Sequence, residues 1–393
     1  MHICGIIAEY DPFHTGHAYQ IQAVREFLGA ECAVVCIMSG NWTQRGAPAI
    51  TDKHTRARLA LMGGADLVLE LPLPYAISSA EWFARGGVSA LNATGVITHL
   101  CFGSECGVLE PLQKTAACLD SEAYRQALHT YLDQGLSFPV ARQEAAQQLI
   151  GNDADCLSTP NNNLGVEYLR ALRHSNSPIT PLTVLRQGAG HGESPCEGFA
   201  SATHIRKLIH QDCVNEALPF LIDCEADILS SASISNYLLA ERAIISTLRQ
   251  LSAEELSRLP DCGEGLSNRL FDAIRQSASI DEILSRVKTK RYTLARLRRI
   301  LLWAFLGLLE SDRPSTPPYL RVLGLNQAGR KVLKEMSTKS TLPLLTKPAH
   351  VMNLSAEAQR LFALESRATD LYGLCLEQIP PCDVEWKRSP AVL

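Results

Sequence analysis

The sequence predicts an α/β fold in which a doubly wound parallel sheet is followed by a mainly helical C-terminal domain. In the first half, short apolar runs alternate with helix-length patterns, as in chains that build such a sheet. Strand signals thin out from about residue 208. The chain has 393 residues, 46% of them hydrophobic, which suffices for two or three packed domains. We therefore expect one domain at 1–207 and a second at 208–393.

Four apolar runs bounded by Gly, Ser, Pro or Asn predict buried parallel strands, and a fifth strand is expected further along. The five are Ile3–Ala8, Ala33–Met38, Leu67–Leu71, His99–Phe102 and Leu182–Leu185. Apolar spacing predicts helices at His17–Leu28, Asp52–Met62, Ser79–Leu91, Ser121–Gln134, Pro139–Ile150 and Leu164–His174. Because ligands bind outside the carboxyl ends of the strands in such sheets, we expect a site in the segments that follow the strands.

The C-terminal part contains a predicted apolar helix at Thr293–Leu309. Six side chains fall on one arc of it, namely Leu294, Leu297, Leu301, Ala304, Phe305 and Leu308. The longest apolar stretch, Ile300–Leu309, has ten residues, which is too few to span a bilayer. No basic segment precedes the first apolar run, so we expect neither a signal peptide nor a membrane partner.

The formal net charge of −4 conceals an uneven distribution. Residues 1–207 sum to −5, 208–285 to −8, 286–347 to +11 and 348–393 to −2. A strongly positive segment either binds a polyanion or is a solvated face. The thirteen cysteines include no C-x-x-C pair, which predicts reduced thiols in a cytoplasmic protein and no structural metal.

The strongest local motif, Glu9-Tyr-Asp-Pro-Phe-His-Thr-Gly-His17, directly follows the first predicted strand. His14 and His17 are three residues apart, so both imidazoles can face one ligand at the start of a helix. A helix N-terminus attracts anions through its free N–H groups. Two imidazoles there can stabilise the charge that develops when an α-phosphate is attacked. We interpret the motif as a nucleotide site, against the alternative of structural histidines.

Three further segments are candidates, each with a structural alternative. The segment Met38–Pro48 follows the second strand and is either a substrate loop or an ordinary connection. Gly103 ends a later strand, where it either lets adenine or ribose approach the backbone or only makes a turn. Ser201 and Thr203 begin a helix one turn before Arg206, as in a phosphate clamp or a capped helix with a surface arginine.

Several motifs together resemble the tRNA(Met) cytidine acetate ligase family, within the HIGH-type nucleotidyltransferase superfamily, over nearly the whole chain. They are Glu9–His17, Met38-Ser-Gly-Asn41, Gln44-Arg-Gly46, Leu69-Glu-Leu-Pro72, Leu100-Cys-Phe-Gly-Ser-Glu105, Pro160-Asn-Asn162, Ser201-Ala-Thr203, Lys288-Thr-Lys-Arg-Tyr-Thr293 and Tyr319-Leu-Arg-Val-Leu-Gly324. Two departures are visible. Asp11 stands where the family has Asn, and Gly190-His-Gly-Glu193 stands where it has an aromatic residue and a His.

The resemblance implies an ATP-dependent ligase that forms N4-acetylcytidine at the wobble position of elongator tRNA(Met). Acetate would attack ATP to give acetyl-adenylate, and the cytosine amine would then take the acetyl group without coenzyme A. The resemblance also implies that Mg²⁺ arrives on the ATP phosphates and that His14 and His17 are catalytic. The implied ATP contacts are Ile7, Ala8, Glu9, Tyr10, Asp11, Pro12, Phe13, His14, Thr15, Gly16, His17, Ala18, Tyr19, Gln20, Gly103, Asn161, Asn162 and Arg186.

The same resemblance gives the basic segment 286–347 a partner, because phosphate contacts supply most of the affinity for RNA. The implied tRNA contacts are Lys288, Lys290, Arg291, Arg296, Arg298 and Arg299. No protein partner is inferred. Two other hypotheses stay open. One is a small-molecule nucleotidyltransferase or adenylate-forming ligase of the pantothenate-synthetase type, which would have no evident use for the C-terminal half. The other is a non-catalytic RNA-binding protein that keeps a relic nucleotide fold.

Overall fold

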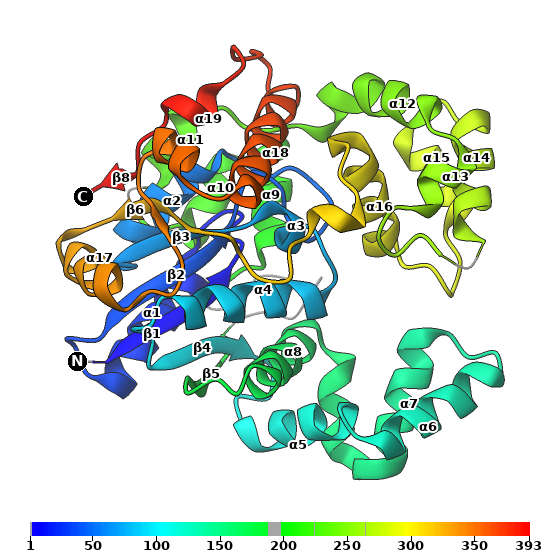
Figure 1. The fold of residues 1–393 in the computed structure, drawn as a ribbon, viewed down its shortest axis with the longest axis horizontal. Coiled ribbons are helices and arrows are strands. Elements are labelled where there is room, and N and C mark those ends of the chain that lie inside the picture. The colour runs from blue at the N-terminus through cyan, green and yellow to red at the C-terminus, as the bar shows by residue number, and fades with distance from the viewer. Residues whose placement is uncertain (1, 188–197, 224, 264) are drawn as a thin grey trace.

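The computed structural model describes residues 2–187, 198–223, 225–263 and 265–393, which share one eight-stranded sheet (Figure 1). The strand order is β5-β4-β1-β2-β3-β6-β7, and β8 pairs with β6. The strands are β1 (Ile3–Ala8), β2 (Ala33–Ser39), β3 (Leu67–Leu71), β4 (His99–Ser104), β5 (Thr180–Leu185), β6 (Leu320–Leu325), β7 (Leu344–Leu345) and β8 (Ala391–Val392). The first five pair in parallel, which confirms the predicted doubly wound core.

Helices cover both faces of this sheet, because its buried strands present apolar side chains on alternate sides. The covering helices are α1 (Thr15–Leu28), α2 (Lys53–Met62), α4 (Ala80–Ala93), α8 (Pro160–His174) and α17 (Gln327–Lys339). On one face Ile7, Ile37 and Leu69 pack under α4, α8 and α17. On the other face Cys36 and Val68 pack under α1 and α2.

The remaining helices form an arm and a lobe, which extend to the same side of the sheet in Figure 1. The arm consists of α5 (Leu109–Leu119), α6 (Glu122–Asp133) and α7 (Phe138–Ile150). The lobe consists of α12 (Glu241–Gln250), α13 (Ala253–Ser257), α14 (Leu266–Gln276), α15 (Ile280–Val287) and α16 (Leu294–Leu306), next to α18 (Ala356–Gly373) and α19 (Val384–Lys387). The short helices are α3 (Leu73–Ala76), α9 (Ala202–His210), α10 (Val214–Ala217) and α11 (Glu225–Ser231). Within the described ranges, no helix is both long enough and apolar enough to cross a bilayer.

The C-terminal part contributes strands that the sequence did not predict. β6 lies antiparallel to β3 and carries the short strands β7 and β8 on its other side. Every residue of β6 is buried, including Arg321, whose charge interrupts the apolar run. Residues near both ends of the chain therefore build one sheet. The domain boundary at residue 207 stays a prediction, although β6 and β8 belong to the same sheet as β1–β5.

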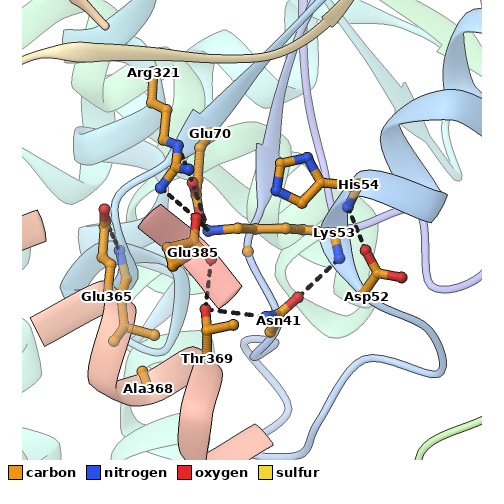
Figure 2. Close-up of polar contacts among 12 residues, drawn as sticks. Asn41, Asp52, Lys53, His54, Glu70, Arg321, Glu365, Ala368, Thr369 and Glu385 are labelled. Atoms are coloured by element: carbon orange, nitrogen blue, oxygen red, sulfur yellow. Dashed lines mark hydrogen bonds and ion pairs between the residues drawn. The ribbon is translucent and has the colours of Figure 1, made fainter. Parts of the chain in front are cut away.

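A buried cluster of charges joins this returning segment to the first half (Figure 2). The Lys53 Nζ lies 2.7 Å from Glu70 Oε1 on β3 and 2.8 Å from Glu385 Oε1 on α19. Arg321 on β6 also pairs with both carboxylates, with its Nε 3.6 Å from Glu70 Oε2. All four side chains are at most 4% exposed. Glu70 and Arg321, which lie in two of the family-like sequence motifs, are thus partners in the core.

Candidate active site

The two motif histidines lie stacked at the start of α1. Their ring centroids are 3.7 Å apart and their planes are inclined by 26°. His14 Nδ1 accepts a hydrogen bond from the Gly16 N–H at 3.1 Å, and His17 Nδ1 accepts one from the His14 N–H at 3.2 Å. Because both Nδ1 atoms accept, the proton of each neutral ring is on Nε2. Each histidine therefore has an Nε2–H that can donate to a ligand.

Both imidazoles are held in the neutral form. Burial, together with the positive charges of Arg186 and Arg206, lowers the pKa of His14 to about 3. Burial, His14 and Arg186 lower the pKa of His17 well below its usual value. At neutral pH the pair is therefore suited to donating hydrogen bonds from fixed positions, rather than to storing a proton.

These lowered pKa values predict that acid destabilises the fold. The unfolded chain binds protons at a histidine more readily than the folded chain, so the free energy of unfolding falls below about pH 6.5. For His14 the expected fall is about 1.4 kcal/mol per pH unit, down to a pH of about 3. Urea titrations at about pH 7, 6 and 5 should show a shallower fall in His14→Gln than in the wild type. Equal slopes would contradict a buried, neutral His14.

A cavity of about 470 Å³ opens beside the histidines, at the carboxyl ends of β1 and β4. Thirteen of the predicted nucleotide and phosphate-clamp residues line it: Ile7, Ala8, Glu9, Tyr10, Asp11, His14, His17, Gln20, Gly103, Asn161, Arg186, Ser201 and Arg206. Other predicted residues lie outside its wall, namely Pro12, Phe13, Thr15, Gly16, Ala18, Tyr19, Asn162 and Thr203. The motif and four separate later segments thus meet at one place.

The wall also contains residues that sequence reasoning did not single out. One part is apolar and comes from α4 and α8, with Ala80, Phe83, Leu164 and Tyr168 beside Phe102 of the Leu100–Glu105 motif. These side chains follow ordinary core patterns, so no local signal distinguished them from the rest of the core. An apolar wall beside hydrogen-bonding groups is typical of small-molecule sites.

The segment 38–48 also reaches the cavity, through Gln44 and Arg45. Glu9 Oε1 accepts a hydrogen bond from the Gln44 N–H at 2.6 Å, and Trp42 Nε1 donates to the Ala368 carbonyl of α18 at 2.9 Å. Gly46 has φ +75°, and a Cβ there would come within 2.6 Å of the Arg298 backbone carbon. The segment is therefore held between β1 and the C-terminal helices, which favours the substrate-loop interpretation over an ordinary connection.

Cationic groups outnumber carboxyl groups around this cavity. Its wall contains the guanidinium groups of Arg45, Arg186, Arg206 and Arg299, against the carboxyl groups of Glu9 and Asp11. Burial raises the pKa of Glu9, so its negative charge is disfavoured. A site with this balance attracts a polyanion such as a nucleoside triphosphate.

The predicted clamp residues contact one another and the first motif. Arg45 Nη1 and Arg206 Nη2 donate to Thr203 Oγ1 at 3.0 and 3.1 Å. Arg206 Nη1 also lies 3.2 Å from Asp11 Oδ2. Asp11, one of the two departures from the family pattern, therefore offsets part of the charge of Arg206. The other departure, 190–193, lies outside the described residues.

Arg186 lies across Gly103, the residue interpreted either as an approach for adenine or ribose or as a simple turn. A Cβ on Gly103 would come within 3.2 Å of Arg186 Cγ, so a glycine gives the arginine room. Glu105 caps the start of α8, because its carboxylate accepts from the Asn161 and Asn162 N–H groups at 3.1 and 2.7 Å. The Asn162 amide oxygen accepts a hydrogen bond from the Glu105 N–H at 2.8 Å. The hydrogen bonds of Asn162 therefore hold the segment that follows β4 against the start of α8.

The six predicted tRNA-binding residues occupy different environments. Lys288, Lys290, Arg291 and Arg298 are exposed, while Arg296 donates to the Asp261 carbonyl at 2.7 and 2.9 Å. Arg299 is half-buried. With Ala295 of the same helix, α16, it lines the cavity at the histidine motif. Elsewhere in 286–347, Arg321 is buried in the charge cluster and Arg313 lies over the Trp82 ring at 3.9 Å. The +11 segment is therefore not one continuous surface.

No cluster of three or more His, Cys, Asp or Glu side chains in the described parts of the chain could hold a metal ion.

Comparison with known proteins places this site in a family. The model of the HIGH Nucleotidyl Transferase family matches residues 1–385. The tRNA(Met) cytidine acetate ligase of Clostridium novyi is 38% identical over 407 residues, covering 100% of both chains, and that of Acetivibrio thermocellus is 37% identical over 95% of each. Crystal structures of Thermotoga maritima TmcAL, one bound with alpha-thio ATP and one apo, superpose with TM-scores of 0.92 and 0.94, at 30% and 31% identity over the full chains. The chain therefore belongs to the tRNA(Met) cytidine acetate ligase family of HIGH nucleotidyl transferases.

Proposed function

We propose that this protein is an ATP-dependent ligase of the cytoplasm that activates acetate as acetyl-adenylate and transfers the acetyl group to N4 of the wobble cytidine of elongator tRNA(Met). One observation carries the chemistry. Two neutral histidines present Nε2–H donors at a helix N-terminus, inside a cavity with four arginines. Relatives that match over 95–100% of both chains and are named tRNA(Met) cytidine acetate ligase support these substrates.

The first step forms a bond between an acetate oxygen and the α-phosphorus of ATP and breaks the bond from that phosphorus to pyrophosphate. Negative charge grows on the phosphate oxygens during this displacement, and fixed N–H donors stabilise such charge most when water is excluded. The Nε2–H groups of His14 and His17 supply these donors. Arg45, Arg186 and Arg206 offset the charge of the pyrophosphate, whose Mg²⁺ arrives with ATP as part of the substrate.

The second step transfers the acetyl group to the cytosine amine and releases AMP. The amine loses a proton to water as the new C–N bond forms, and the oxygen bridging acetyl and phosphate leaves with AMP. Ala295 and Arg299 of α16 and Gln44 and Arg45 of the segment 38–48 line one part of the cavity. We assign the approach of the unpaired wobble base to this part, because such bases are recognised splayed out of the anticodon loop.

Incubation with ATP, labelled acetate and bulk tRNA tests the proposal directly. We expect label in the wobble cytidine of the methionine tRNA, dependent on ATP and independent of coenzyme A. Label in a small product and none in tRNA would favour a pantothenate-synthetase type of ligase. The absence of any acetate-dependent pyrophosphate release, with tRNA still bound, would favour a non-catalytic RNA-binding protein.

The exposed basic residues before α16 give a separable prediction about tRNA. Replacing Lys288, Lys290 and Arg291 with alanine should weaken tRNA binding and lower its salt slope by about one unit for each phosphate that is no longer bound. Acetate-dependent pyrophosphate release without tRNA should stay at the wild-type rate, because none of the three lines the cavity. Arg299 would be a poorer probe, since it lines the cavity itself.

A matched control lies on α17, at the far side of the sheet from the lobe (Figure 1). Replacing the exposed Arg330, Lys331 and Lys334 with alanine removes the same charge. We expect this variant to bind tRNA like the wild type. Equal losses in the two triple variants, measured by filter binding over a range of salt, would mean that only net charge matters.

A further inference from the structure

A second cavity, of about 410 Å³, lies between the start of α2 and the helices α18 and α19. It shares no lining residue with the cavity at the histidine motif. Its polar lining includes His54 and Asp370, and its apolar lining includes Leu376, Ile379 and Pro380. A concave site with an apolar wall and a few polar groups is a candidate for a small ligand.

His54 is the first sign that something binds there. Both of its ring nitrogens are buried, and neither finds a hydrogen-bond partner within the described chain. Burial and the neighbouring positive charge of Lys53 lower the pKa of His54 to about 4, so the ring is neutral and one nitrogen keeps a free lone pair. Figure 2 shows the ring beside the Lys53 side chain, at the edge of the charge cluster. A buried acceptor without a donor is costly, and a ligand N–H would satisfy it.

The carboxylates around the cavity indicate that its ligand is positively charged. Asp52 is occupied by the cap of α2, where it accepts from the His54 N–H at 2.9 Å, and Glu385 is paired with Lys53 and Arg321. Asp370 differs, because it accepts a hydrogen bond from the Asp383 N–H at 2.9 Å but no described cation lies within ion-pair distance of it. One cation, the exposed Arg388, completes the lining against these three carboxylates.

We propose that this cavity binds a small aliphatic diamine. One ammonium group donates to His54 and the other to Asp370, and the alkyl stem lies against Ile379 and Pro380. Ile379 is 66% exposed, which is high for a large apolar side chain, and the stem would cover it. The proposal does not depend on the acetate chemistry. An amine supplies both the positive charge that Asp370 lacks and the N–H donor that His54 lacks.

Calorimetric titration of the full chain with 1,5-diaminopentane, without ATP or tRNA, tests the proposal. Pentane-1,5-diol has the same stem without the charge, and we expect it not to bind. His54→Phe keeps an aromatic ring but removes the acceptor, and Asp370→Asn removes the charge. We expect each variant to bind the diamine about tenfold more weakly or worse, since hydrogen bonds to charged groups have roughly this effect.

Asp133→Asn on α6 is the control, because Asp133 is an exposed carboxylate outside this cavity. It should bind the diamine like the wild type. Wild-type affinity in both His54→Phe and Asp370→Asn would overturn the proposal. So would binding of the diol as tight as that of the diamine, or an equal loss in Asp133→Asn, which would indicate attraction to net charge only. If His54→Phe does not fold, comparing the diamine affinities of Asp370→Asn and Asp133→Asn still tests the proposal.

Discussion

Replacing His14 or His17 with alanine is expected to slow acetyl-adenylate formation by about 10²-fold or more, the scale observed when one fixed donor to a developing oxyanion is lost. The expectation rests on the Nε2–H of each neutral ring, since both Nδ1 atoms are used inside the helix cap. Acetate-dependent pyrophosphate release at saturating ATP measures the effect. His129→Ala, which changes a histidine on α6 outside the cavity, should keep the wild-type rate.

The cap itself needs a separate variant, because His14 is also the N-cap residue of α1. Asparagine is a good N-cap, so His14→Asn should keep the helix start while removing the Nε2–H donor. We expect His14→Asn to be as slow as His14→Ala, with the two variants differing in stability. A wild-type rate in His14→Asn would mean that the histidine serves only to begin the helix.

Replacing Lys53 with methionine is expected to lower the free energy of unfolding by about 3–5 kcal/mol, the cost of leaving buried charges without their partner. Lys53 lies between Glu70 and Glu385, and its loss leaves two buried carboxylates with Arg321 as the remaining cation in the cluster. Equilibrium unfolding in urea, followed by circular dichroism, measures the change.

Lys114→Met gives the matched comparison, because Lys114 also pairs with two carboxylates, Glu110 and Asp153, but at the surface. Water already screens those charges, so this variant should unfold close to the wild type. Similar losses in Lys53→Met and Lys114→Met would show that the buried cluster does not hold β6 and α19 to the core.

The sequence predicted the parts of the fold that depend on local pattern. The strands β1–β5 are apolar runs with turn residues at their ends, and each forms within two residues of its expected bounds. The histidine motif was also local, since strand, turn and helix start lie within fifteen residues of one another. β6 escaped prediction because Arg321 resembles a surface charge unless its partners Glu70 and Glu385 are known to be nearby.

The cavity wall was predictable where it follows the strands or begins a helix, as at Asn161 and Ser201. Arg299 lies on the same helix as exposed arginines, and nothing in its neighbourhood distinguishes a residue facing solvent from one facing the cavity. Its position depends on α16 packing against Gly46, an approach of residues more than two hundred positions apart. Long-range packing of this kind has no signature in a single sequence.

The anchoring of Trp42 to the Ala368 carbonyl has a consequence for how the protein is made. The ribosome synthesises the helix that holds the loop at 38–48 more than three hundred residues after the loop itself. A nascent or prematurely terminated chain can therefore bury its first strands without completing the cavity wall. We expect such chains to lack ATP turnover, so that acetate activation begins only after α18 has been made.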